Sequence, residues 1–504
     1  MNLREKESNS KTRQGNGTAT CQRIQEQINK NQKEMGSCSQ KNPVCPAVTQ
    51  TEGRETMAQR NTGLSSPTVF MYYTGGTVGM VHGQDGEHPG KPGEFTEELQ
   101  RHPELYSKKD NGWFLLPPKA FDECGEFASV KYQVEEVLEP IDSSKMTPAD
   151  WENIAHKILD QDKKGFDGFV ILHGTDTLAY TSSALSFLLQ GLNKPVVVTG
   201  AQRSLFEPRS DAVSNILGSL LIAGCYSKNP ALQQVCVFFH NKLFQGNRVQ
   251  KSDCDAFDAF DSPNMEPLAV FGPTIKVKLP FGFKKTSAIA KPSLKQSKSA
   301  LCIAVDTSQP VLLFPLKKRC DKMPVTRVLR IFPGITKSCV DNFLASADGI
   351  VLETYGNGNA PDEDWFSEAL KRATDHNVLI INCTQVHRGS VRPVYEAGDW
   401  LKKAGVLSGY DITTEAALTK MYWVLQHFES EESKQVMQMS VCGEMTIIPE
   451  SSVKNKVHIV ASHWAPEKGW TASRNGCEDA GPAWCCLPFF HPVIPSPRPG
   501  LHRP

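Results

Sequence analysis

The feature that most constrains the fold is a short buried strand that runs into a glycine and then into hydroxyl and acidic side chains. Phe169 to Leu172 is an apolar run long enough for one strand. His173-Gly174 ends the run, and Thr175-Asp176-Thr177 opens a helical pattern over Leu178 to Leu189. A hydroxyl, a carboxylate and free backbone N–H groups therefore meet at the edge where open parallel sheets bind ligands. The alternative is that Asp176 only caps the helix.

A second copy of this pattern lies upstream. Thr68 to Tyr73 reads as a strand, and Gly75, Gly76 and Thr77 follow it closely. Two glycines allow the backbone to approach a ligand, and the Thr77 hydroxyl then lies beside main-chain N–H donors. A dinucleotide-binding turn is disfavoured because Thr77 stands where its second glycine is required, and the Gly-Lys-Ser/Thr of a Walker loop is absent. A purely structural turn stays as the alternative.

Two further polar loops are candidates by position. Asp142-Ser143-Ser144 lies between an extended segment and a helix start at Thr147-Pro148, where a hydroxyl precedes a proline. Lys251 lies in a polar loop that follows a strand over Gln234 to Phe239. Each signal is weak alone, because loop serines usually serve turns and loop lysines are usually solvated.

The order of the segments predicts an α/β fold with two domains. Strands and helices alternate from about residue 67 to 270, which predicts a larger domain with a mostly parallel sheet flanked by helices. Three later strands, with helical patterns between them, predict a smaller α/β domain. The predicted divisions are a disordered extension (1–66), the larger domain (67–279), a connection (280–324), the smaller domain (325–448) and an irregular tail (449–504).

Composition excludes several classes of protein. The chain of 504 residues has a formal net charge of zero, so nothing in it indicates a nucleic-acid or membrane partner. It has no apolar run of about 18 residues and no hydrophobic signal segment near its start. The 15 cysteines are scattered without C-x-x-C spacing. We therefore expect reduced thiols and a cytoplasmic protein.

The candidate residues suit hydrolysis if the fold brings them together. A threonine hydroxyl is a weak nucleophile that needs a base, and a desolvated lysine can serve because burial lowers its pKa. Thr77 and Thr175 supply hydroxyls, Lys251 an amine and Asp176 an orienting carboxylate. Backbone N–H groups of the glycine turn can hold an oxyanion. The G-x-S-x-G of serine esterases and the H-E-x-x-H of zinc peptidases are absent.

Several motifs resemble those of the L-asparaginase family, over roughly residues 67 to 448. The two signature motifs correspond to Tyr73 to Met80 and to His173 to Thr177. Motifs that resemble the cytosolic type I branch are Asp142-Ser143-Ser144, Thr199-Gly200-Ala201-Gln202, Arg209-Ser210-Asp211, Phe332-Pro333-Gly334-Ile335 and Thr413-Thr414-Glu415-Ala416-Ala417.

The resemblance implies a specific reaction without a metal or other cofactor. L-asparagine and water would give L-aspartate and ammonia, in a homodimer or homotetramer. Thr77 would be the nucleophile that forms an acyl-enzyme ester, and Thr175, Asp176 and Lys251 would handle protons. Thr175 and Asp176 would also bind the substrate, together with Asp142, Ser143 and Ser144.

The chain departs from the family pattern in one place that matters. Many bacterial members carry a tyrosine in the lid after the nucleophile, and this chain has none between Val78 and Leu105. The Gly- and Pro-rich stretch Met80 to Glu94 is either that lid or an ordinary surface loop. Two other functions stay open: a protein of the amidotransferase that supplies ammonia for glutaminyl-tRNA formation, and a catalytically silent asparagine-binding protein.

Overall fold

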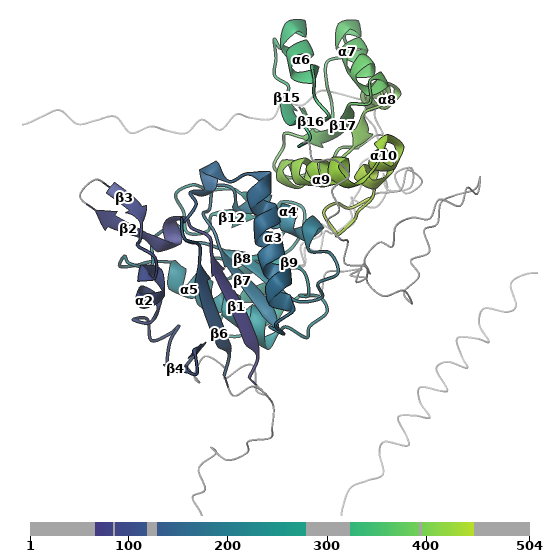
Figure 1. Ribbon diagram of the computed structural model, residues 1–504. Helices are drawn as coiled ribbons and strands as arrows, with labels where there is room; N and C mark the ends of the chain where they lie inside the picture. Colours follow the sequence, from purple (N-terminus) through teal and green to yellow (C-terminus); the bar gives the residue numbers. More distant parts are fainter. Residues whose placement is uncertain (1–65, 84–85, 118–128, 279–322, 393–395, 448–504) are drawn as a thin grey trace, which may run out of the picture. The chain divides into compact units, whose positions relative to one another are not determined.

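The computed structural model describes residues 66–83, 86–117, 129–278, 323–392 and 396–447 (Figure 1). The predicted extension (1–66), connection (280–324) and tail (449–504) lie outside these ranges, apart from Ser66, Met323 and Pro324. The predicted domain limits therefore stay predictions.

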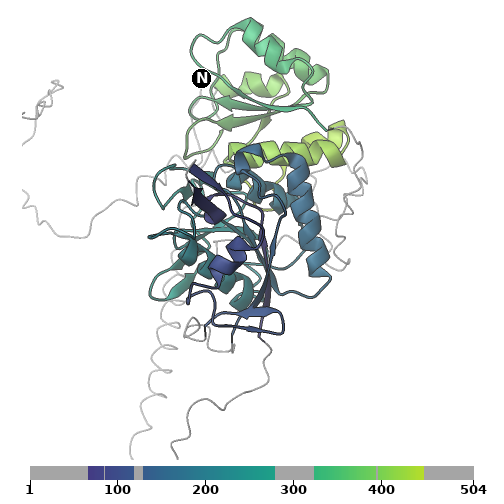
Figure 2. The same cartoon turned by 60° about the vertical axis from the view of Figure 1, so that its left-hand side comes forward.

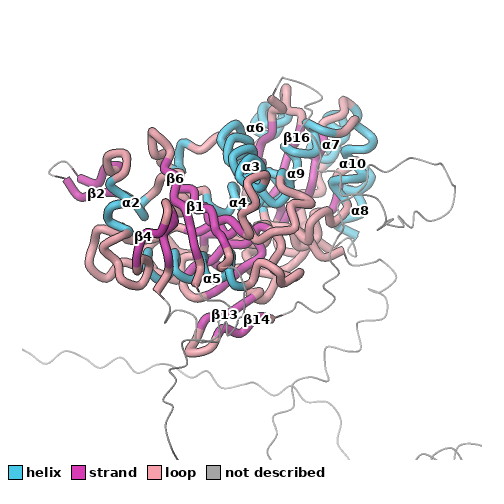
Figure 3. Tube along the Cα trace, turned by 60° about the horizontal axis from the view of Figure 1, so that its bottom comes forward, coloured by secondary structure: helices cyan, strands magenta, loops and turns pink. Residues whose placement is uncertain are grey.

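The larger sheet has ten strands in the order β14-β13-β10-β9-β8-β7-β1-β6-β5-β4 (Figure 3). Its five central strands, β9 to β6 in that order, pair in parallel, and the strands added at both edges pair antiparallel. The central strands are β1 (Thr68–Tyr73), β6 (Lys131–Glu136), β7 (Gly168–Leu172), β8 (Val196–Thr199) and β9 (Val235–Phe239). The edge strands are β4 (Lys108–Asp110), β5 (Trp113–Leu115), β10 (Lys242–Gln245), β13 (Ala269–Phe271) and β14 (Ile275–Val277).

Helices cover both faces of this sheet, which explains why its middle strands are apolar on both sides (Figures 1 and 2). Alternate residues of β1 enter different cores: Met71 packs in one cluster with Ile216, and Phe70 packs in another with Ile154. The first cluster contains residues of α2 (Glu94–Leu99) and α5 (Ala212–Cys225), and the second contains residues of α3 (Pro148–Asp162) and α4 (Leu178–Leu188).

The chain order places a switch point at β1. The chain runs from β1 to β6 on one side of it and then to β7 on its other side. The loops after these three strands are tied together, because Thr74 N donates to Leu172 O at 3.0 Å and Ile141 N donates to Thr74 O at 2.8 Å. Open α/β sheets bind ligands in the crevice outside the carboxyl ends at such a point.

The smaller sheet is parallel throughout, in the order β15-β16-β17-β18. Its strands are β15 (Thr326–Arg330), β16 (Gly349–Thr354), β17 (Leu379–Thr384) and β18 (Leu407–Ser408). Its helices are α6 (Lys337–Leu344), α7 (Asp364–Asp375), α8 (Glu396–Lys403), α9 (Thr414–His427) and α10 (Ser430–Gln438). A large, mostly parallel sheet domain with a separate smaller one confirms the predicted fold class.

Two local predictions need correction. The helix expected from Arg209 begins at Ala212, because Arg209 has a left-handed backbone with φ 60° and Asp211 accepts hydrogen bonds from Gln202 N and Arg203 N instead. The stretch Met80 to Glu94, expected to be a loop, contains the strand pair β2 (Met80–Gly83) and β3 (Gly86–Pro89).

In the part of the chain that the structure describes, no helix combines the length and the apolar character that a bilayer crossing requires.

Candidate active site

Three loops at the switch point touch one another through glycines. A Cβ atom placed on Gly76 would lie 2.3 Å from the Cα of Gly174, and one on Gly174 would lie 2.5 Å from Ser143 Oγ. Gly76 also has a φ of 86°, which side chains with a Cβ rarely adopt. Only glycine permits this contact, and it brings together the residues that follow, Thr77 and Thr175, with Ser143 beside them.

Lys251 reaches the same place from a distant part of the sequence. Its Nζ donates to Thr175 Oγ1 at 2.9 Å and forms an ion pair with Asp176 Oδ1 at 2.7 Å. The predicted loop around it contains the two-residue strand β11 (Gln250–Lys251), which pairs antiparallel with β12 (Phe260–Asp261). The structure therefore joins a hydroxyl, an amine and a carboxylate directly.

Asp176 does not cap the following helix. Thr177 occupies the N-cap position of α4, and no side chain accepts a cap hydrogen bond there. Thr177 Oγ1 instead donates to Ser143 O at 2.7 Å, which ties this loop to the one after β6. The side chain of Asp176 is 62% exposed, so its carboxylate faces both Lys251 and solvent. The structure thus excludes the capping alternative.

The loop after β6 forms a single 3₁₀ turn over Ser143–Lys145. Asp142 and Ser144 are exposed, and Ser143 is buried. Asp142 Oδ1 accepts a hydrogen bond from Ser144 N at 3.0 Å, and that bond holds the pKa of the Asp142 carboxyl below its usual value. A carboxylate and a hydroxyl are thereby presented at the rim of the same crevice.

Thr77 begins a 3₁₀ turn over Thr77–Gly79 and is half-buried. Among the described residues its hydroxyl makes no hydrogen bond, in contrast to that of Thr175. Its place beside the Thr175 group follows from the backbone contact between Gly76 and Gly174. The strand pair β2–β3 comes directly after it in the chain.

His173 is a residue of this region that sequence reasoning treated only as the end of a strand. It is fully buried, and burial lowers its pKa to about 4. The neutral ring fits its partners: Nδ1–H can donate to Gly174 O at 2.7 Å, and Nε2 can accept from Thr181 Oγ1 at 2.9 Å. His173 therefore fixes the peptide group just before Thr175. A histidine next to the strand-end glycine was the available signal.

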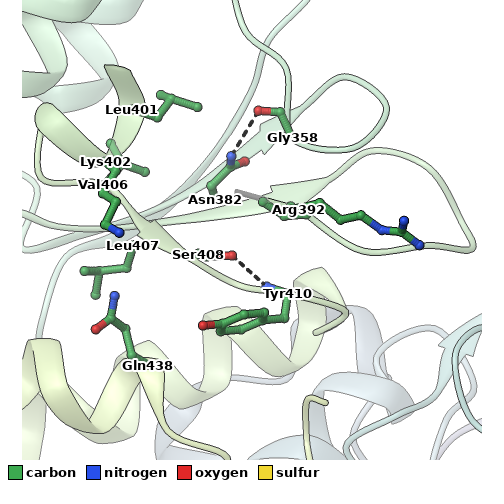
Figure 4. Close-up of a pocket in the computed structure, with 11 residues that line it drawn as sticks. Gly358, Asn382, Arg392, Leu401, Lys402, Val406, Leu407, Ser408, Tyr410 and Gln438 are labelled. Atoms are coloured by element: carbon green, nitrogen blue, oxygen red, sulfur yellow. Dashed lines mark hydrogen bonds between the residues drawn. The ribbon is translucent and has the colours of Figure 1, made fainter. Parts of the chain in front are cut away.

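No group of three or more His, Cys, Asp or Glu side chains in the described ranges could hold a metal ion. A separate cavity of about 380 Å³ lies in the smaller domain (Figure 4). Asn382, Ser408 and Tyr410 contribute to its wall, and none of the predicted site residues does. The site at the switch point and this cavity are thus different places.

Family models match both halves of the chain. The model described as "Asparaginase, N-terminal" covers residues 68–281, and the model described as "Glutaminase/Asparaginase C-terminal domain" covers residues 327–437. L-asparaginase 1 from Escherichia coli (strain K12) is 36% identical over 386 residues, which span 76% of this chain and 99% of the relative.

The chain belongs to the L-asparaginase family.

Other members carry other names. The 60 kDa lysophospholipase of Mus musculus is 34% identical over 81% of this chain and 67% of its own length. A glutamyl-tRNA(Gln) amidotransferase protein from Pyrococcus horikoshii is 30% identical over 65% of this chain and 69% of its own length. Among solved structures, L-asparaginase I from Vibrio cholerae has a TM-score of 0.58 and 34% identity, and the match covers 76% of this chain and all of that one. An asparaginase-family amidohydrolase fits these findings.

Proposed function

We propose that this protein hydrolyses L-asparagine to L-aspartate and ammonia through a threonine ester. The observation that carries the proposal is the direct bonding of Thr175, Asp176 and Lys251 beside the turn that holds Thr77. A hydroxyl on a glycine turn and a second, amine-linked hydroxyl at one sheet edge suit a two-step acyl transfer.

In the first step Thr77 Oγ attacks the side-chain amide carbon of asparagine. The C–N bond breaks, the nitrogen leaves as ammonia after it gains a proton, and the acyl group stays on Thr77. Backbone N–H groups of the Gly75–Thr77 turn are suited to stabilise the developing oxyanion. In the second step water attacks the ester, and Thr175 with Lys251 takes up its proton. When the amine is deprotonated, the hydrogen bond between these two reverses and the Thr175 hydroxyl donates.

The substrate's charged groups have partners at the rim of the crevice. Asp176 is proposed to face the α-amino group, and Ser143, with Asp142 and Ser144 beside it, the α-carboxylate end. The exposure of Asp176 and Asp142 supports this, because both carboxylates are open to the crevice and to solvent. We further propose that the enzyme works in the cytoplasm as a homodimer or homotetramer, which sedimentation of the purified chain would measure.

A coupled ammonia assay with L-asparagine and L-glutamine tests the function. Thr77→Ala is expected to lower kcat by about 10³-fold or more while the fold is kept, because the nucleophile is lost. Thr77→Ser keeps a hydroxyl and is the matched control. An aspartyl group on the peptide that contains Thr77, detected by mass spectrometry after acid quench, would identify the ester. Normal turnover by Thr77→Ala would refute the assignment.

A second candidate is an ammonia-supplying component of a larger enzyme, which the amidotransferase relative favours. Such a protein passes its ammonia to a partner that binds tRNA. Co-purification with that partner, and ammonia release that depends on it, would favour this function over free hydrolysis. Binding of asparagine without any ammonia release would instead indicate a silent binding protein.

A further inference from the structure

The last described segment of the chain contacts the turn that leads to Lys251. We call Val441–Thr446 the clasp and Gln245–Arg248 the lysine turn, because Lys251 follows it by three residues. Gln245 Nε2 and Asn247 Nδ2 each donate to Cys442 O at 3.1 Å. Residues almost 200 positions apart in the sequence are therefore bonded at the edge of the candidate site.

Arg248 makes the strongest set of these contacts. Its side chain is 6% exposed, and each of three nitrogens has its own acceptor. Nε donates to Gly443 O at 2.6 Å, Nη1 to Asp411 Oδ2 at 3.0 Å and Nη2 to Thr446 Oγ1 at 3.2 Å. A planar guanidinium held at three points has one orientation, and lysine could not reproduce it.

The clasp is itself anchored. Lys420 and Glu444 form a fully buried ion pair at 2.7 Å, and Glu444 accepts hydrogen bonds from Val441 N and Cys442 N. Burial opposes ionisation of Glu444, but Lys420 and these N–H groups hold its pKa below the usual value. A charged Glu444 therefore keeps the clasp on α9, which contains Lys420.

The lysine turn has a second anchor on the helix that follows the candidate site. Ser182 Oγ of α4 donates to Gly246 O at 2.7 Å. Because α4 begins just after Thr175 and Asp176, the turn is held to their helix on one side and to the clasp on the other. Gln250 adds a bond to Glu415 at 3.1 Å.

We propose that Arg248 is a positioning residue for Lys251, and that the clasp is the brace that keeps Arg248 in place. The proposal rests on the proposed role of Lys251 in catalysis. Arg248 does not reach the reacting atoms, so it acts through the turn. A displacement of Lys251 by about 1 Å is expected to lower the rate by about 10²-fold, since catalysis depends steeply on geometry.

The test uses the full chain and separates positioning from general stability. Arg248→Met is expected to lower kcat by about 10- to 100-fold with little change in KM. Trp423→Leu is the control, because it disturbs another contact between the two halves, the ring pair of Phe187 and Trp423 with centroids 5.8 Å apart. This control should lose thermal stability and keep kcat.

Milder variants keep the test decisive if Arg248→Met does not fold. Arg248→Lys keeps a cation for Asp411 but loses the bonds to Gly443 and Thr446, so kcat should still fall. Thr446→Val should lower kcat slightly, and Thr446→Ser, which keeps the hydroxyl, should restore it. Native kcat in Arg248→Lys, or a loss in Arg248→Met no larger than in Trp423→Leu at equal thermal stability, would overturn the proposal.

Hydrogen exchange of residues 245–251, measured by mass spectrometry, distinguishes failure of this proposal from failure of the proposed function. If the native chain releases no ammonia, the function is wrong, and faster exchange of this peptide in Arg248→Lys than in Trp423→Leu still supports the brace. Equal exchange in the two variants would reject the brace whatever the activity.

Discussion

Two lysine–carboxylate pairs in this molecule have the same N···O distance and opposite surroundings. Lys251–Asp176 and Lys420–Glu444 are both 2.7 Å apart. The side chains of the first pair are 20% and 62% exposed, and those of the second are both 0% exposed. An exposed pair stabilises a fold by little, whereas removing one partner of a buried pair leaves an uncompensated charge. The first pair is thus free to serve chemistry, and the second holds the clasp.

The largest expected effect is on catalysis, at the open pair. Lys251→Met should lower kcat by about 10² to 10⁴-fold, because it removes the proposed proton carrier of Thr175. Its free energy of unfolding should change by less than about 1 kcal/mol. Lys242→Met, which breaks the exposed pair with Asp258 at 2.6 Å, is the matched control and should keep kcat. Equal activity of the two variants would remove Lys251 from the mechanism.

The next effect is on stability, at the closed pair. Lys420→Met should lower the free energy of unfolding by about 3–5 kcal/mol, because Glu444 is left charged and buried. Urea unfolding of the variant and the native chain measures this. Lys434→Met, in the exposed pair with Glu431, should cost less than about 1 kcal/mol. If the two costs were similar, burial would not distinguish these pairs.

His173 extends the comparison, because it is as buried as Lys420 but lies beside the open site. Burial lowers its pKa to about 4 from 6.5, so between these values the unfolded chain binds a proton that the folded chain does not. This contribution is complete above pH 6.5 and is lost as the pH falls toward 4, up to about 3 kcal/mol. His173→Gln should therefore lose less stability than the native chain between pH 7 and 4.5. Parallel losses in urea unfolding would contradict the burial of a neutral ring.

The smallest expected effect is the coupling within the open pair. A double-mutant cycle on Lys251→Met and Asp176→Asn should give about 0–1 kcal/mol of interaction energy in unfolding. Molar salt should reduce it further, since exposed charges are screened. A coupling of several kcal/mol that resists salt would show that this pair is structural, as the pair of Lys420 and Glu444 is.

Much of the site was open to prediction because its parts are local. The strand, glycine and hydroxyl at Thr77 and at Thr175 occur within a few residues, and parallel strands bring their carboxyl ends to one edge. The strand pair β2–β3 was not predicted, because its polar, glycine-rich residues lack the alternation that indicates strands. The roles assigned to the individual site residues stay predictions.

The contacts of Lys251 and Arg248 could not be predicted for a different reason. Lys251 bonds to residues 75 and 76 positions away, and Arg248 to residues 163 to 198 positions away. No pattern within a short window of sequence reports such a pairing. His173 likewise looked like a strand end, because its burial and its bond to Thr181 depend on packing.

The order of amino acids was enough to establish the α/β class, the strand-end glycines and the residue types available for chemistry, since these follow from local periodicity and from the steric freedom of glycine. The folded chain was needed to show that Asp176 pairs with Lys251 instead of capping α4, and that the clasp meets the lysine turn. Burial and long-range hydrogen bonds arise only in the packed chain, because packing makes neighbours of residues that are far apart in sequence.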